Sequence, residues 1–124
     1  MAKIAIFSAL FGLYLLYSFT VYTKGTDNNV TVSATERLKI NYGKQVFQQY
    51  NCIACHQLYG LGGYLGPELT TAFSDSNRGE MYMKAFLKGG GQRMPNFHFS
   101  DDEISTIISY LKYVDETAVT YKTP

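Results

Sequence analysis

The sequence predicts an all-α protein in which one N-terminal transmembrane helix precedes a single small helical domain. Three observations support this fold class: an uncharged apolar run near the N-terminus, later amphipathic segments with helix-capping sequences, and no convincing strand pattern. The 124 residues are enough for one domain and little more. We therefore divide the chain into an anchor at residues 1–24, a linker at 25–32 and a domain at 33–124.

The first segment, residues 4–23, contains twenty residues without a charged side chain. As a helix it would span about 30 Å, the thickness of the hydrocarbon core of a bilayer. Its second half carries the aromatic side chains expected near a membrane interface, Tyr14, Tyr17 and Tyr22. The alternative is a cleaved signal peptide, whose apolar region spans only about 7–15 residues and ends in small residues. This run is longer and ends in Val-Tyr-Thr-Lys, which favours a retained anchor.

The polar residues of the linker lead into the first helix of the domain. Ser33-Ala-Thr-Glu36 fits a capping box and predicts the start of this helix. Apolar side chains then recur at steps of three and four residues, at Leu38, Tyr42, Val46, Phe47 and Tyr50. Gly43 inside this helix costs about 1 kcal/mol relative to alanine. We interpret it as the point where another helix crosses closely rather than as a mild defect.

Residues 57–77 contain many glycines and few periodic signals, so we expect a long loop there. A short helix should follow from Arg78 to Lys88, with Met81, Phe86 and Leu87 facing inward, and three glycines should end it.

A second capping box, Ser100-Asp-Asp-Glu103, predicts the start of the last helix. Its buried stripe should consist of Ile104, Ile107, Ile108, Leu111 and Val114. We expect this helix to end near Glu116, to pack against the first helix of the domain, and to be followed by a frayed or partner-bound tail.

The densest chemical signal is Cys52-Ile-Ala-Cys55-His56, and it holds both cysteines of the chain. C-x-x-C-H is the attachment sequence of c-type haem. Two thiols three residues apart on one helical turn can reach the two vinyl groups on one edge of a porphyrin. The next residue then presents an imidazole to the iron, for which neutral histidine is a good ligand. We therefore expect one covalent haem c.

Other uses of these residues fit less well. A structural zinc site needs four ligands, and His98 is the only histidine outside the motif. A disulfide between Cys52 and Cys55 would leave His56 unexplained. A thioredoxin-like redox pair needs a βαβ context, and no strand pattern precedes the motif.

The second iron ligand could come from Met81, Met83, Met94 or His98. Met81 and Met83 lie in the predicted helix, where methionine more often fills the core. Met94 precedes Pro95, which disfavours a helical backbone, so its side chain can project from a loop. We predict His56 and Met94 as the axial ligands, with His98 as the rival. Iron ligated by histidine and methionine has no open position and transfers electrons.

The near-neutral net charge of +1 and the lack of a basic stripe give no support for nucleic-acid binding. One lysine flanks each end of the apolar segment, so charge alone does not set its orientation. Haem c is attached outside the cytoplasmic membrane, so we expect a single-pass protein of the bacterial inner membrane. Its N-terminus would be cytoplasmic and its haem domain periplasmic.

The arrangement of these motifs resembles the class I cytochrome c fold. The resemblance rests on Gly43 and Phe47 before the haem motif, Gly66-Pro67-Glu68-Leu69 after it, the loop methionine, and Tyr110-Leu111 in the last helix. It implies that Gly43 meets Tyr110. It also implies that the Pro67 carbonyl accepts a hydrogen bond from Nδ1–H of His56, which orients the ring and increases its basicity.

The chain also resembles the cytochrome c subunit of respiratory nitric oxide reductases, a group within the haem–copper oxidase superfamily. The anchor, the single haem domain and the run Tyr-Gly-Leu-Gly-Gly-Tyr-Leu-Gly-Pro-Glu-Leu after His56 carry this resemblance. The family usually has a glutamate where this chain has Leu61.

This second resemblance implies a non-catalytic electron-transfer subunit. Its partners would be a soluble donor, either a small cytochrome c or a cupredoxin, and a large multi-helix membrane subunit with b-type haems that reduces nitric oxide. It also implies an interface calcium ion held by backbone oxygens of Gly62 and Tyr64, consistent with the oxygen ligands that calcium prefers. The alternative function is a free membrane-anchored cytochrome c that carries electrons to a terminal oxidase or another periplasmic reductase.

Overall fold

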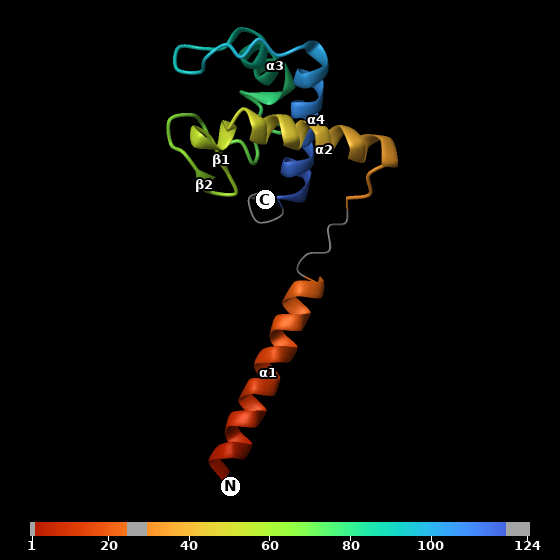
Figure 1. Ribbon diagram of the computed structural model, residues 1–124, viewed down its shortest axis with the longest axis vertical. Helices are drawn as coiled ribbons and strands as arrows, with labels where there is room; N and C mark the ends of the chain where they lie inside the picture. Colours follow the sequence, from red (N-terminus) through yellow and green to blue (C-terminus); the bar gives the residue numbers. More distant parts are fainter. Residues whose placement is uncertain (1, 25–29, 119–124) are drawn as a thin grey trace.

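The computed structural model describes residues 2–24 and 30–118 and confirms the predicted helical fold (Figure 1). Helix α1 (Ala2–Lys24) is followed by the helical part that carries the haem motif. The elements of that part are α2 (Ala34–Gln49), the 3-10 turn η1 (Cys52–Ala54), β1 (Gln57–Leu58), β2 (Leu61–Gly62), α3 (Gly79–Gly89) and α4 (Asp101–Thr117).

Helix α1 is long and apolar enough to cross a membrane, and none of its residues is buried within the protein. In Figure 1 it extends away from the other helices. An apolar helix with no protein surface to cover it needs a lipid environment, which agrees with the predicted anchor.

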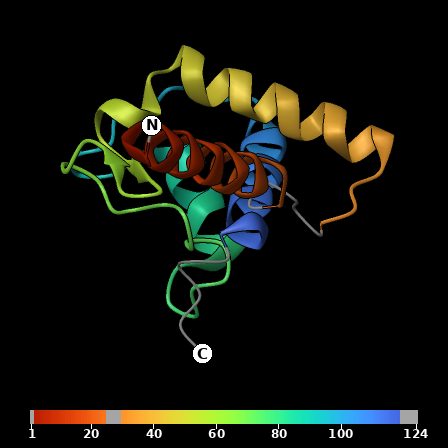
Figure 2. The same cartoon turned by 90° about the horizontal axis from the view of Figure 1, so that it is seen from below.

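Helices α2 and α4 cross at Gly43, and the prediction of a close crossing is confirmed (Figure 2). A Cβ atom added to Gly43 would lie 1.9 Å from the carbonyl oxygen of Thr106. The atoms nearest to a Cβ at Gly43 belong to the backbone of Thr106 and Ile107, and Tyr110, one turn after Thr106, packs against Phe47 with ring centroids 5.6 Å apart. The pairing of Gly43 with Tyr110 that the resemblance implied stays a prediction.

The predicted apolar face of α2 is buried only in its second half. Val46 and Phe47 are buried, whereas Leu38 is 71% exposed and Tyr42 is 48% exposed. At about 100° per residue, Tyr42 and Leu38 lie about 100° and 140° around α2 from Gly43, the residue that faces α4. Both side chains therefore point away from the contact with α4.

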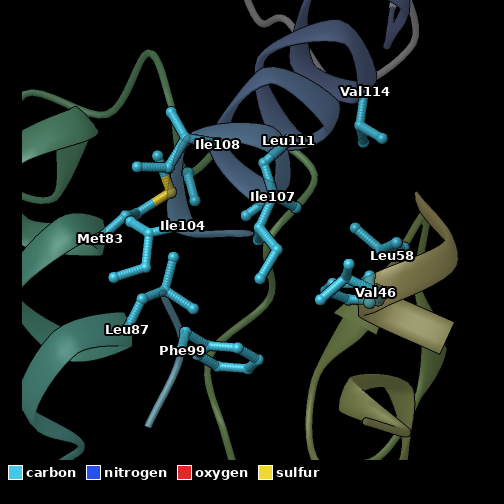
Figure 3. Packing of buried hydrophobic residues seen from close by; sticks show 12 residues of the cluster. Val46, Leu58, Met83, Leu87, Phe99, Ile104, Ile107, Ile108, Leu111 and Val114 are labelled. Carbon is cyan, nitrogen blue, oxygen red and sulfur yellow. The ribbon is translucent and has the colours of Figure 1, made fainter. Parts of the chain in front are cut away.

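The core lies where α2, α3 and α4 meet, and Figure 3 shows α3 contributing Met83 and Leu87 to it. The whole predicted stripe of α4 is buried there: Ile104, Ile107, Ile108, Leu111 and Val114. In α3 the prediction for Leu87 is confirmed, whereas Met81 is 81% exposed and was wrongly placed. Met83 takes the inward position because it lies one helical turn before Leu87.

Side-chain caps begin both long helices of this part, as predicted. The Ser33 hydroxyl accepts a hydrogen bond from the Glu36 backbone N–H, and Ser100 and Glu103 form a complete capping box. Asp115 in α4 is buried, a feature that the sequence did not predict. Its carboxylate accepts hydrogen bonds from the backbone N–H and the hydroxyl of Ser74, at 2.8 and 3.0 Å.

The expected loop after the haem motif begins with a small antiparallel hairpin that the sequence did not predict. In this hairpin Gln57 pairs with Gly62 and Leu58 pairs with Leu61. Strands of two residues give too short a pattern to recognise in a sequence. Residues 63–77 are irregular, as predicted, and α3 begins at Gly79, one residue after the predicted start at Arg78. The predicted tail at 117–124 lies almost entirely outside the described residues.

Candidate functional site

The haem motif forms one tight turn after α2. Asn51 adopts a left-handed backbone conformation with φ of 51°, which ends the helical path and starts η1. The backbone N–H of His56 donates to the Cys52 carbonyl at 2.9 Å. Both thiols are free and half-buried. Burial raises the pKa of the Cys52 thiol to about 11, so this thiol is protonated at neutral pH.

The His56 ring is held by the carbonyl of Pro67. Its Nδ1 lies 2.8 Å from the Pro67 oxygen, the contact that the resemblance implied. A carbonyl can only accept, so Nδ1 must carry the proton and donate it. The lone pair of the neutral ring therefore lies on Nε2, the nitrogen that remains free to ligate a metal.

The glycines after the motif let the chain pass close to this turn. A Cβ at Gly66 would lie 2.5 Å from Cε1 of His56, and one at Gly63 would lie 1.9 Å from the Ala54 oxygen. Gly62 has φ of 131°, and a Cβ there would lie 2.2 Å from the His56 oxygen. These positions therefore have a packing reason to be glycine, apart from any role in ion binding.

Backbone hydrogen bonds fasten the loop to the turn. Gly63 N–H donates to the Ile53 oxygen at 2.9 Å, and Gly66 N–H donates to the Cys55 oxygen at 2.8 Å. Leu69 N–H donates to the Gln57 oxygen at 2.9 Å. The Pro67 carbonyl therefore lies on a segment that is attached on one side to Cys55 of the haem motif and on the other side to Gln57, the residue after the motif.

A polar network that the sequence analysis missed surrounds the same segment. The Glu68 carboxylate accepts hydrogen bonds from the backbone N–H and the hydroxyl of Thr70, and the Thr70 hydroxyl oxygen accepts from the Tyr59 N–H. Arg78 donates from Nη1 to the Glu68 carbonyl at 2.9 Å and from Nε to Asp75 at 2.7 Å. The three-residue spacing of Asp75 and Arg78 is visible in the sequence, but nothing in it indicates the contact with Glu68.

Hydrogen bonds from the Asn77 backbone N–H and then from Arg78 hold the pKa of the Asp75 carboxyl below its usual value. Asp75 is therefore a carboxylate at neutral pH, which suits its pairing with the Arg78 guanidinium.

Met94 lies in the loop between α3 and α4, half-buried against the hydrophobic core. The loop folds back on itself, because Gly91 N–H donates to the Met94 oxygen at 2.8 Å. Cys52 and Phe97 border the same core cluster, so the first thiol and the candidate methionine belong to one apolar environment. His98 is exposed, and its backbone N–H donates to the Asn96 side chain at 2.8 Å.

These residues fit a covalently attached haem. Two free thiols lie on one turn, the His56 imidazole donates Nδ1–H to Pro67 and leaves Nε2 for a metal, and a loop methionine borders the apolar cluster. In residues 2–24 and 30–118 no three His, Cys, Asp or Glu side chains come together to hold a metal ion. The arrangement therefore suits an iron that a porphyrin brings with it, and a single protein imidazole could ligate it.

Comparisons with known proteins agree with this chemistry. A family model described as cytochrome c oxidase, cbb3-type, subunit III matches residues 39–111. A nitric oxide reductase subunit from Stutzerimonas stutzeri is 28% identical over 118 residues, which cover 87% of this chain and 80% of that protein. The protein of the same name from Cereibacter sphaeroides is 29% identical over 122 residues, with the same coverage of 87% and 80%.

Proposed function

We propose that this chain, which belongs to the family described as cytochrome c oxidase, cbb3-type, subunit III, delivers electrons to the catalytic subunit of a membrane nitric oxide reductase. The chain is a membrane-anchored electron-transfer cytochrome with haem c as its cofactor. The finer proposal of a nitric oxide reductase rests on the names of its relatives. The observation that carries electron transfer is the turn at Cys52–His56 with its histidine tethered to Pro67.

Each residue of the turn has a defined role in this proposal. Cys52 and Cys55 would hold the haem covalently, each thiol adding its sulfur and its proton across one vinyl group. His56 would present Nε2 to the iron, and its Nδ1–H on the Pro67 carbonyl orients the ring and increases its basicity. The bound haem supplies a one-electron iron couple.

Met94 is the proposed second ligand, and it would close the iron to external molecules. Its half-buried position at the edge of the apolar cluster supports this role over the exposed His98. Met94→Ala should let carbon monoxide bind the reduced protein, while the wild type should not bind it. The matched variant Met81→Ala changes an exposed methionine and should behave like the wild type. Carbon monoxide binding to the wild type would contradict this ligation.

The hairpin and the loop after it form the proposed contact with the catalytic subunit, a large membrane protein with b-type haems. Leu61, Tyr64 and Leu65 are 72%, 87% and 68% exposed, and their apolar surface lies directly beside the haem turn. A calcium ion held there by the backbone oxygens of Gly62 and Tyr64 is part of this proposal. Removal of calcium by a chelator should then weaken the complex, and an unchanged complex would remove the ion from the proposal.

The proposed topology places the N-terminus in the cytoplasm and residues 33–124 in the periplasm, with a small cytochrome c or a cupredoxin as the donor. Protease added outside spheroplasts should digest the haem domain and leave α1 protected. Digestion of the haem domain only after lysis would contradict this orientation.

Purification of the full chain in mild detergent tests the proposed function. We expect a large multi-helix subunit to copurify, together with nitric oxide reduction by the complex. A chain that runs alone would contradict the subunit role and favour a free membrane-anchored cytochrome. The family description also names an oxidase, so copurification with oxygen reduction instead would redirect the proposal to a terminal oxidase.

A further inference from the structure

We propose that Arg78 is a positioning residue for His56: by fixing the peptide after Glu68, it holds the Pro67 carbonyl on the Nδ1–H of the imidazole. The inference rests on the proposed function, in which His56 ligates a haem iron. It adds a residue that lies outside both the haem motif and the Gly-Pro segment.

The peptide unit between Glu68 and Leu69 is held by two hydrogen bonds. Its carbonyl accepts a hydrogen bond from Arg78 Nη1 at 2.9 Å, and its N–H donates to the Gln57 oxygen at 2.9 Å. Both polar groups of this peptide are therefore paired, and its plane is held from two sides. Arg78 supplies the bond on the carbonyl side.

The neighbouring peptide unit, between Pro67 and Glu68, carries the Pro67 carbonyl. Only the two backbone dihedrals of Glu68 separate the two peptide planes. Proline has no N–H, so Pro67 cannot anchor itself by donating a hydrogen bond. On the other side, the nearest backbone anchor is Gly66 N–H on the Cys55 oxygen at 2.8 Å. The direction of the Pro67 carbonyl thus depends on its neighbours.

An arginine suits position 78 better than a lysine. The guanidinium of Arg78 reaches two acceptors at once, with Nε on Asp75 at 2.7 Å and Nη1 on the Glu68 carbonyl. Its side chain is 27% exposed and that of Asp75 is 26% exposed, so the pair is partly shielded from water. A planar fork with fixed donors can make both bonds in one geometry, whereas a lysine presents a single ammonium.

The consequence is a contribution to the reduction potential. A well-placed carbonyl on Nδ1–H makes the imidazole a stronger donor to the metal. If the carbonyl moves away, the imidazole donates less, ferrous iron is favoured, and the reduction potential becomes more positive. Removing a group that hydrogen-bonds directly to a metal ligand typically lowers metal affinity or activity by about 10–100-fold. Arg78 acts one peptide further away, so we expect the equilibrium constant for reduction of the haem to change by about threefold to tenfold. This change corresponds to a shift of at most about 59 mV in the reduction potential.

The experiment compares Arg78→Gln, Arg78→Lys and the wild type, each as the haem-loaded full chain in detergent. Two quantities are measured: the reduction potential, and the solvent exchange rate of the His56 Nδ1–H in the reduced, diamagnetic state by NMR. We expect both variants to show a more positive potential and proton exchange at least about tenfold faster. Lys84→Gln, which removes a surface cation of the Glu80 pair, is the control and should match the wild type.

The outcomes separate positioning from charge. Unchanged exchange in Arg78→Gln would overturn the proposal, and so would full recovery of the wild-type values in Arg78→Lys, because that variant keeps the charge and loses the fork. If Arg78→Gln does not fold, Asp75→Asn takes its place. This variant should shift the reduction potential to a more positive value by a smaller amount, and an unchanged potential would overturn the proposal. A wild-type chain without haem, or with iron not ligated by His56, would instead refute the proposed function.

Discussion

Replacing Gly43 with alanine should destabilise the helical domain, even though alanine is the better helix former. The new Cβ would lie 1.9 Å from the Thr106 oxygen and 2.4 Å from the Thr106 carbonyl carbon. Ordinary contact begins near 3.4 Å, so α2 and α4 would have to separate by about 1.5 Å. The obstacle is a backbone carbonyl, which cannot rotate away as a side chain can.

The cost of this separation falls on the packed residues around the crossing, such as Val46 and Ile107, which are 2% and 1% exposed. Overpacking of a well-packed core typically costs about 1–3 kcal/mol, and we take the upper end because the backbone blocks relaxation. The gain in helix propensity from glycine to alanine returns about 1 kcal/mol. The net effect should be a loss of about 2 kcal/mol in the free energy of unfolding.

Urea unfolding of the full chain in detergent, followed by far-UV circular dichroism, measures this loss. With a typical urea dependence of about 2 kcal/mol per molar, the midpoint should fall by about 1 M. Gly89→Ala is the matched control, because a Cβ there meets nothing within 4 Å, and it should not lower the midpoint. A Gly43→Ala chain as stable as the wild type would contradict the close backbone contact between α2 and α4 at Gly43.

Three further variants test other contacts. In Gly66→Ala the new Cβ would lie 2.5 Å from Cε1 of His56 and should push the imidazole ring off the Pro67 carbonyl. The visible spectrum of the haem should then show altered histidine ligation, and an unchanged spectrum would contradict this prediction. Asp115→Ala removes the acceptor of two Ser74 hydrogen bonds and should lower the free energy of unfolding by about 1.5–3 kcal/mol in the urea assay, and a neutral variant would contradict this. Ser100→Ala removes the cap of α4 and should lower the free energy of unfolding by about 1 kcal/mol. An unchanged urea midpoint in this variant would show that the cap does not stabilise the domain.

The sequence predicted those parts of the fold that depend on local patterns. The capping serines, the apolar stripe of α4 and the close approach at Gly43 all follow from neighbouring residues in the chain. The error at Met81, and the exposure of Leu38 on an apolar face, arise because periodicity shows that a face is apolar and not whether another element covers it. Coverage depends on the crossing point and the angle of the helices, which are properties of the tertiary structure.

The candidate site also has residues that could be predicted from the sequence and contacts that could not. Cys52, Cys55 and His56 stand together in the sequence, so their motif could be recognised directly. The contact between His56 and the Pro67 carbonyl was implied by a resemblance and is present in the structure. The contact of Arg78 with the Glu68 carbonyl joins a side chain to a backbone atom ten residues away. A backbone carbonyl exists at every position, so no residue type marks such a contact in a sequence.

The intact mass of the chain purified from its membrane tests the central claim most directly. We expect a mass larger than that of the polypeptide by one haem, and this added mass should persist after denaturation and extraction with acidified organic solvent. The double variant Cys52→Ala with Cys55→Ala should have the mass of the polypeptide alone. A wild-type chain with the mass of the unmodified polypeptide, or one that loses its haem on denaturation, would contradict covalent attachment at the turn and the electron transfer that depends on it.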